Sequence, residues 1–565
     1  MKKLVSLVLA LMMLFSCAAM AELKMSEPGV MPFVEEVTPL TMAIAQHTLV
    51  LDYDDNYMTK LVEGDTNIDI QWQLRPGAET ATAVDLMMAS GEELPDVFLY
   101  GFGNKTAAYG AEGYFQVLND YFDKETGLAY CFWNEATHMT EEDYAEYFKR
   151  STEADGNMYA FSFYTRGLGD SYKTTPHINM HWLKALNLEM PTNTDELYTV
   201  LKAFKEQDPN GNGQADEIPM IGGTWNGYDD EMIINMFIYY NQDYMLNVKD
   251  DVVYAPFVTD EWQQAMIYMN KLVSEGLLSD LTFSITTDEL VSMVQSYGPE
   301  EQIIGVLVGT FTTTAPDSTK PCVLAYDILP PFEGAYTPMR TANCTRFGYI
   351  TEDCEYPELA FRFFDYWCNE KRSLISRYGE PGVHWLWRED DPEYFDEYFP
   401  GGPVPNAEMN GWDPELGMVT GVTNPWSTQN NAIWNTHLTS LLPMQTYGQW
   451  ATIDTVKIES WEHSQEVQNI TAHRTWVGAK AGSMWRSNPD KQVFTDPNYT
   501  TEELDKYNDT INTLKDYVKE TIASFATGTL DPVNDWETYK ANLESAGLSD
   551  WLEVAQTYWN RANGL

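Results

Sequence analysis

Residues 208–219 place oxygen-bearing side chains at the spacing of a calcium-binding loop. An EF-hand loop takes ligands from positions one, three, five, seven and nine, with glycine at position six, where the backbone turns sharply. Gly213 occupies position six, but position twelve, where a bidentate glutamate is usual, is Pro219. Glu217 is then the nearest carboxylate that can close the shell. The predicted ligands are Asp208, Asn210, Asn212, Gln214 through its backbone carbonyl, Asp216 and Glu217.

The missing glutamate at position twelve argues against a sensor whose helices open on calcium binding. We therefore predict a structural Ca²⁺ ion that fixes the loop and takes no part in chemistry. A protein facing the outside medium can use such a weak site, because calcium there is about millimolar. The alternative is an acidic turn without metal, since Asp, Asn and Gly are also the residues that turns prefer.

Composition limits the classes of partner. A chain of 565 residues is too long for one hydrophobic core, so about two or three domains are expected. It carries 85 acidic against 34 basic residues, a formal net charge of -51 at pH 7. Nucleic acid and anionic membrane surfaces are therefore not expected as partners, and a neutral ligand is favoured over a polyanionic one.

The N-terminus is typical of an export signal, here assigned to residues 1–21. Lys2 and Lys3 precede an apolar run over residues 4–15 that is too short to span a membrane. Residues 14–17 resemble a bacterial lipobox, which would make Cys17 the lipid-bearing N-terminus on the outer face of the cytoplasmic membrane. A competing cut after Ala21 would release a secreted protein and discard Cys17.

The remaining cysteines show neither CxxC nor Cys/His metal spacing, so no zinc site is predicted. We interpret them as small buried apolar residues. Cys344 and Cys354 form the one close pair that could be bridged. The set is Cys131, Cys322, Cys344, Cys354 and Cys368.

Strands and helices are expected to alternate around these motifs. Residues 40–45 are predicted to form a strand, and the alternation of Ile68, Ile70 and Trp72 predicts a second one. A helix that ends near Ser90 and a third strand over 94–100 are expected next along the chain. Thr192 with Asp195 predicts a helix start, and the apolar period that follows leads directly into the calcium loop. A strand over 218–222 follows, and the chain closes with one long helix over 511–525 and two more helices between Trp536 and Arg561. This rhythm predicts an α/β fold.

Several stretches then resemble one family. They are residues 89–96, 155–160, 181–188, the Tyr-Gly-x-x-Gly segment from Tyr378 and the Phe-x-x-Gly segment from Phe525. Their shared order, with the export signal, resembles the large carbohydrate-binding solute-binding proteins of bacterial ABC importers, a group that includes lipoproteins. The resemblance implies two α/β lobes of the periplasmic-binding-protein type, with a hinge, an interlobe cleft and a helical C-terminus.

The lobes are expected to be discontinuous in sequence, with crossings near residues 164–169 and 325–331. The implied division has four pieces after the signal. Residues 22–165 begin lobe 1, 166–325 begin lobe 2 with the loop 208–219, 326–390 return to lobe 1, and 391–565 complete lobe 2.

A sugar site needs flat aromatic platforms and planar polar groups. The predicted platforms are Trp225, which follows a strand end, and Trp385 with Trp387, which would share one side of an extended chain. Asn56 and Tyr57 follow the first strand, and Arg166 lies near the first crossing. Each has a structural alternative. The tryptophans can belong to the core, Asn56 and Tyr57 to a solvated acidic turn, and Arg166 to a salt bridge. Trp182 is assigned to the core.

The sequence therefore predicts a monomeric binding protein that captures a neutral oligosaccharide and passes it to the membrane subunits of an ABC permease. Contact with the membrane is expected through a lipid anchor only, and no catalysis is expected. Adjacent carboxylates such as Asp54 and Asp55 are common by chance in so acidic a chain, and they point apart on a strand. The alternatives are a secreted calcium-dependent glycosidase or lyase, and a non-transport sensor or adhesin of the same fold.

Overall fold

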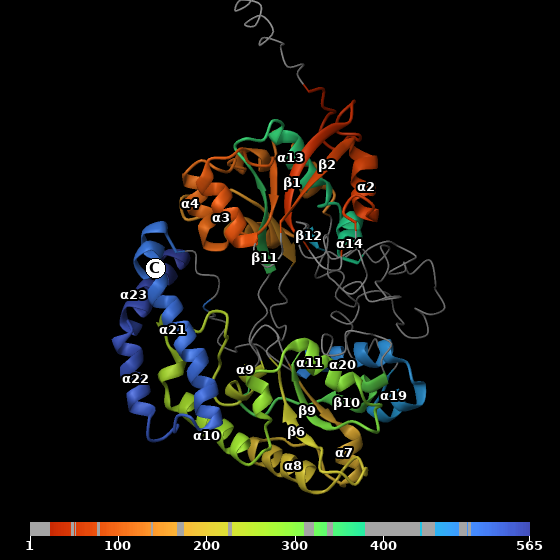
Figure 1. Ribbon diagram of the computed structural model, residues 1–565, viewed down its shortest axis with the longest axis vertical. Coiled ribbons are helices and arrows are strands. Elements are labelled where there is room, and N and C mark those ends of the chain that lie inside the picture. Colours follow the sequence, from red (N-terminus) through yellow and green to blue (C-terminus); the bar gives the residue numbers. More distant parts are fainter. Residues whose placement is uncertain are drawn as a thin grey trace, which may run out of the picture.

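The structure is a computed structural model that describes residues 23–46, 50, 52–75, 80–136, 139–165, 175–223, 229–309, 321–335, 343–378, 441–442, 458–484, 494 and 499–565. Figure 1 shows two α/β lobes, one above the other. We call the lobe around the six-stranded sheet lobe 1 and the lobe around the four-stranded sheet lobe 2. The α/β class and the two-lobe architecture expected from the sequence are confirmed.

Lobe 1 has the strand order β12-β4-β11-β3-β1-β2, so β2 is an edge strand. β1 pairs in parallel with β2 and β3, whereas β11 is antiparallel to both β3 and β4. The strands are β1 (Thr38–Ala45), β2 (Ile68–Arg75), β3 (Val97–Leu99), β4 (Phe161–Thr165), β11 (Asn343–Ile350) and β12 (Leu441–Leu442). The helices are α2 (Tyr57–Thr66), α3 (Thr80–Ser90), α4 (Thr106–Ala111), α5 (Tyr130–Asn134), α6 (Glu141–Ser151), α13 (Pro357–Tyr366) and α14 (Glu370–Tyr378), with 3₁₀ turns Gly103–Lys105 and Asn119–Phe122.

Lobe 2 has the strand order β10-β5-β9-β6, and a separate hairpin, β7-β8, lies beside it. Its strands are β5 (Thr175–Asn179), β6 (Ile218–Ile221), β7 (Asn247–Lys249), β8 (Val252–Tyr254), β9 (Ile304–Gly309) and β10 (Tyr326–Ile328). Its helices are α7 (Met180–Ala185), α8 (Thr194–Glu206), α9 (Asp229–Ile234), α10 (Asp260–Ser274), α11 (Thr287–Gln295), α19 (Trp461–Val467), α20 (Ile470–Met484), α21 (Thr501–Thr527), α22 (Trp536–Ser545) and α23 (Leu548–Asn563), with 3₁₀ turns Pro256–Val258, Asp280–Phe283 and Pro321–Ala325.

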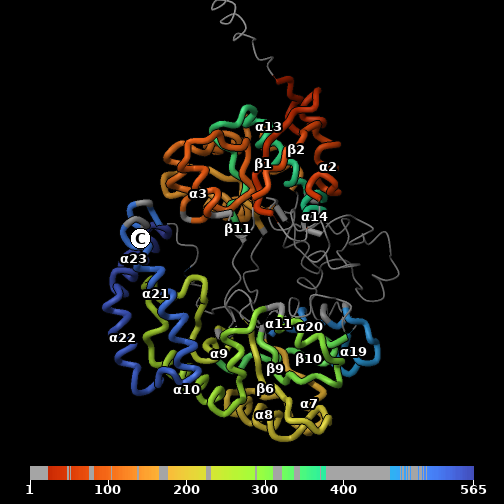
Figure 2. Tube along the Cα trace, in the orientation of Figure 1, coloured from red at the N-terminus to blue at the C-terminus, as the bar shows by residue number. Residues whose placement is uncertain are grey.

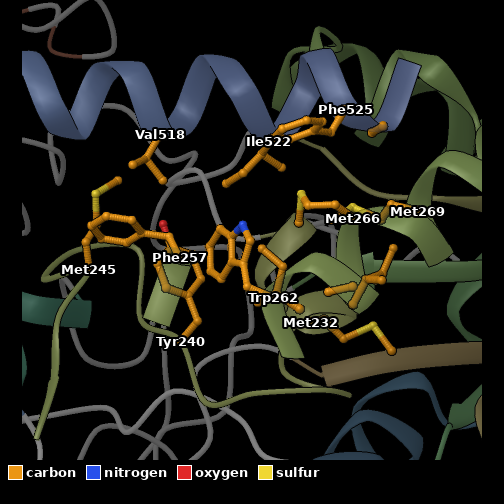
Figure 3. Close-up of a cluster of buried hydrophobic side chains, with 14 of the residues drawn as sticks. Met232, Tyr240, Met245, Phe257, Trp262, Met266, Met269, Val518, Ile522 and Phe525 are labelled. Carbon is orange, nitrogen blue, oxygen red and sulfur yellow. The ribbon is translucent and has the colours of Figure 1, made fainter. Parts of the chain in front are cut away.

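The C-terminal helices belong to the core of lobe 2. Figure 3 shows Val518, Ile522 and Phe525 of α21 directed at Trp262 and Met266 of α10. All of these side chains are buried in one hydrophobic cluster, as the apolar period over residues 511–525 predicts. A capping box at Thr500 and Glu503 begins α21, and Gly528 in the left-handed region ends it.

The chain changes lobes along its length, as the colours in Figure 2 show. β4 ends at Thr165 in the sheet of lobe 1, and β5 begins at Thr175 in the sheet of lobe 2. Two short strands lie where the expected division does not put them. β10 (Tyr326–Ile328) pairs with β5 of lobe 2 rather than opening the return to lobe 1, and β12 (Leu441–Leu442) pairs with β4 of lobe 1. Strands of two or three residues carry no periodicity, so only their backbone partners place them. The other boundaries of the division stay a prediction.

α8 confirms the strongest helix pattern in the sequence. Leu197, Val200, Leu201 and Phe204 are buried at the predicted spacing. The predicted start at Thr192 is wrong by one residue. Asn193 is the N-cap, because its amide oxygen accepts the N–H of Glu196 at 2.9 Å.

The core assignments made for single residues are also confirmed. Trp182 is fully buried, and its ring meets that of Phe204 edge to face with 5.1 Å between centroids. The five cysteines after Cys17 are free thiols, including Cys344 and Cys354, and four of the five are buried. Among the helices that the structure describes, none is both long and apolar enough to cross a membrane.

Candidate functional site

The predicted calcium loop joins the end of α8 to the start of β6. Asp208 adopts a left-handed backbone conformation (φ 47°), which turns the chain out of the helix. Gly211 and Gly213 are also left-handed, with φ values of 68° and 73°, so glycine at position six serves the turn as expected. The loop is tied to the segment that leads into β9, because the Asn210 amide donates to the Gln302 carbonyl at 3.4 Å.

The side-chain oxygens of the loop fold back onto its own backbone. The Asp208 carboxylate accepts the N–H groups of Asn212 at 3.1 Å and Gly213 at 3.0 Å. The Asn210 oxygen accepts the N–H of Asn212 at 3.0 Å. The Asn212 amide donates to both oxygens of Asp216, at 3.1 and 3.2 Å. A carbonyl oxygen has two lone pairs, so the amide oxygens keep capacity for a further partner.

Glu217 is the residue of the loop whose environment points most directly to a cation. Its Oε1 atom is buried and has no hydrogen-bond partner among the residues that the structure describes. Burial raises the pKa of the Glu217 carboxyl, and the negative charges of Asp216 and Asp208 add to the rise. An orphaned carboxylate oxygen beside two other carboxylates fits a hard cation such as Ca²⁺. Within the described ranges, however, no three His, Cys, Asp or Glu side chains are arranged to hold a metal on their own.

The structure leaves all three predicted aromatic platforms untested. Five predicted site residues lie outside the described residues, and their roles stay predictions. They are Trp225, Trp385, Trp387, Arg166 and the lipidation site Cys17.

Asn56 and Tyr57 lie at the start of α2, in lobe 1. The Asn56 side chain is buried and caps the helix by accepting the N–H of Met58 at 3.1 Å. That bond gives Asn56 a structural role, while the Tyr57 side chain is 37% exposed. Neither residue lines the pocket described next, and ligand contact by either stays a prediction.

A pocket of about 550 Å³ opens along the free edge of β2, at a place that the sequence did not single out. One wall is the turn that precedes α2, and the other is the strand itself. The Tyr53 ring packs edge to face on Trp72, with 5.8 Å between centroids. The lining residues are Asp52, Tyr53, Asp54, Asp69, Ile70, Gln71, Trp72 and Leu74. The alternation of β2 was visible in the sequence, but its position at the edge of the sheet depends on the other strands.

Two ion pairs join a buried carboxylate to a half-buried cation, one pair in each lobe. Glu153 pairs with Arg346 of β11 at 2.9 Å, and Asp327 of β10 pairs with Lys480 of α20 at 2.5 Å. Burial raises the pKa of Glu153 and of Asp327, and in each case the cationic partner opposes the rise. These charges hold elements together within each lobe, so we assign them no part in ligand binding.

Comparison with known proteins agrees with this architecture. The fructooligosaccharide ABC transporter substrate-binding protein FusA of Streptococcus pneumoniae serotype 4 is 25% identical over 551 residues, which cover 94% of this chain and 91% of FusA. Lipoprotein LipO of Bacillus subtilis is 26% identical over 282 residues, 49% of this chain and 51% of LipO. A solved structure of an EF-hand mutant of S. pneumoniae FusA, bound to fructo-nystose, superposes with a TM-score of 0.68 at 20% identity, covering 93% of this chain and 100% of that one.

The family itself is identified by a match over more than half of the chain. Residues 52–371 match the family described as bacterial extracellular solute-binding protein. The matched region begins at the turn beside the β2 pocket and ends within α14, so it includes the strands from β2 to β11 and the loop at residues 208–219, while β1 and β12 lie outside it. The chain therefore belongs to the bacterial extracellular solute-binding protein family.

Proposed function

We propose that this protein captures a neutral oligosaccharide outside the cell and delivers it to the membrane subunits of an ABC permease, without breaking any bond in it. The family match on a two-lobe fold carries the proposal. FusA, which shares 25% identity over nearly the whole chain, is named for fructooligosaccharide transport and supports a saccharide as the ligand. The net charge of -51 favours a neutral saccharide over an anionic one.

Binding is proposed to close the two lobes about the segments that cross between them. The ligand stabilises the closed form by contacting both lobes at once, which neither lobe can do in the open form. Trp225, Trp385 and Trp387 are the proposed aromatic platforms. Asn56, Tyr57 and Arg166 are proposed to contribute from the lobe 1 side and the first crossing. The chain is proposed to act as a monomer.

The loop at residues 208–219 is proposed to hold a structural Ca²⁺ ion. The inward-facing oxygens and the orphaned Glu217 Oε1 support it, as does the existence of an EF-hand mutant of the structural neighbour FusA. When bound, the ion supplies positive charge that offsets the repulsion between the loop carboxylates. Asp208, Asn210, Asn212, Asp216, Glu217 and the Gln214 carbonyl would hold it.

The protein is proposed to be exported and anchored through Cys17, with a soluble secreted form if cleavage follows Ala21. The extracellular family and the lipoprotein LipO among its relatives support export and an anchor. Mass spectrometry of the mature N-terminus separates the two forms. A diacylglyceryl group on Cys17 supports the anchor, and an N-terminal Glu22 overturns it.

A thermal-shift screen of the mature protein tests the main proposal. A ligand that binds the native state alone raises the melting temperature by mass action. The panel contains the neutral trisaccharides kestose, maltotriose and mannotriose and the anionic trigalacturonate. We expect a rise with at least one neutral sugar and no new reducing ends after prolonged incubation. Release of reducing ends, or no shift with any neutral sugar, contradicts the proposal.

A further inference from the structure

We propose that the pocket along the free edge of β2 is a subsite that holds one ring of a neutral saccharide and rejects uronic-acid rings. The inference rests on the proposed function, and it adds the place and the charge selectivity of one ring-binding site. The pocket lies within lobe 1 and contains none of the platforms predicted from the sequence. Its volume of about 550 Å³ is ample for a single pyranose or furanose ring with bound water.

The strand that forms one wall presents backbone groups to the pocket. Asn67 and Arg75 use their carbonyls to accept N–H groups from the β1 side, at 2.9 and 2.7 Å. Backbone groups alternate along a strand, so the even-numbered residues from Ile70 to Leu74 point away from β1. The N–H of Ile70 is already occupied, because it donates to Glu63 Oε1 at 3.0 Å. The other two even-numbered residues, Trp72 and Leu74, both line the pocket.

The apolar wall suits the C–H face of a sugar. Trp72 is half-buried, and the Tyr53 ring fixes its orientation by edge-to-face packing at 5.8 Å. Leu74, which also lines the pocket, is 40% exposed, so part of its apolar surface is available to a ligand. A rigid indole with an adjacent exposed leucine offers a flat apolar surface at low entropic cost.

The polar wall suits hydroxyl groups and repels anions. Of the eight lining residues, Asp52, Asp54 and Asp69 are acidic and none is basic. Asp52 is occupied, since its Oδ1 accepts the N–H groups of Asp54 and Asp55 at 2.9 Å. Asp69 accepts one bond from the Gln71 amide at 3.3 Å, which leaves lone pairs for a ligand. The Asp54 carboxylate accepts no bond from the part of the chain that the structure describes.

Ionised carboxylates are acceptors only, so they bind the donor hydroxyls of a neutral sugar through charge-assisted bonds. A uronate would place its own carboxylate among these groups, with no lining cation to neutralise it. The pocket therefore selects by charge through Asp54 and Asp69, whereas the Asp52 carboxylate fixes the turn.

The test compares Asp54→Asn and Asp69→Asn with the wild-type mature protein by titration calorimetry. The probes are whichever of kestose, maltotriose and mannotriose the wild type binds best, and trigalacturonate. Each amide variant should lose about tenfold in affinity for the neutral trisaccharide, because a charge-assisted bond becomes a neutral one. Trigalacturonate should bind the double variant measurably better than it binds the wild type.

Asp120→Asn is the matched control, since it removes one exposed carboxylate from the same lobe outside the pocket. It should change neither affinity. Unchanged melting temperatures confirm that the pocket variants are folded. If the wild type binds a neutral trisaccharide and the Asp54 and Asp69 variants bind both probes as the wild type does, the subsite is refuted while the proposed function stands. If the wild type binds none of the neutral sugars, the proposed function fails and the subsite with it.

Discussion

Replacing Asp208 by alanine should destabilise the protein in two separable parts. The first part is independent of calcium, because the carboxylate accepts the N–H groups of Asn212 at 3.1 Å and Gly213 at 3.0 Å. In an exposed loop, these two bonds together contribute about 1 kcal/mol. The second part depends on calcium. A weak extracellular site has a Kd of about 0.1 to 1 mM, so 10 mM calcium stabilises the native state by about 1.4 to 2.7 kcal/mol.

The assay is urea unfolding followed by tryptophan fluorescence, in 10 mM calcium and in excess chelator. Wild type should gain the calcium increment and Asp208→Ala should not. Asp531→Ala is the matched control, because its carboxylate also caps a turn, accepting the N–H groups of Val533 at 2.8 Å and Asn534 at 2.9 Å. It should lose its turn bonds and keep the full calcium increment. An Asp208→Ala protein that still gains as much from calcium as wild type refutes the assignment of the loop.

Three further predictions concern the fold. Gly305→Ala should lower the free energy of unfolding in urea by about 1 to 3 kcal/mol, because a Cβ at this position in β9 would lie 2.4 Å from the Phe204 ring. A change below the error of the assay would contradict this packing. Burial raises the pKa of Asp365 from 3.8 to about 7. The native state then binds this proton more tightly than the unfolded chain, so the contribution of Asp365 stabilises at low pH and is lost as pH rises from about 4 through about 7. Unfolding midpoints of Asp365→Asn measured between pH 4 and pH 8 should therefore vary less than those of wild type, and an identical profile would exclude this source. Asp327→Ala should cost about 3 kcal/mol by removing the buried carboxylate that pairs with the half-buried Lys480, and adding Lys480→Met should recover most of this loss. A double variant no better than the single one would show that the pair is not the cause.

The parts of the fold that follow from local patterns were predictable from the sequence. In α8, the spacing of Leu197, Val200, Leu201 and Phe204 marks a single buried face, and the structure buries all four. The cap was placed one residue too early because Thr192 and Asn193 are both good capping residues. The choice between them depends on which side-chain oxygen reaches the N–H of Glu196.

The parts that depend on distant strands were not predictable in the same way. The alternation of β2 is local, but its place at the edge of the sheet follows from its pairing with β1 alone among the described strands. The pocket beside Trp72 therefore left no signal in the sequence. Likewise, β12 consists of Leu441 and Leu442, and only its pairing with β4 assigns it to lobe 1. In the loop at residues 208–219, the left-handed glycine at position six was predictable from the spacing, because all the groups of the loop lie within one short segment, and the calcium ion stays a proposal.

Capture of a sugar without chemistry is the central claim, and one titration tests it most directly. The mature protein is titrated with the neutral trisaccharide that raises its melting temperature most, and the recovered sugar is then analysed by chromatography. We predict binding at one ligand per chain and recovery of the trisaccharide intact. Recovery of shorter sugars would show that the protein is an enzyme. The absence of binding heat at every temperature tried would contradict a saccharide as the ligand.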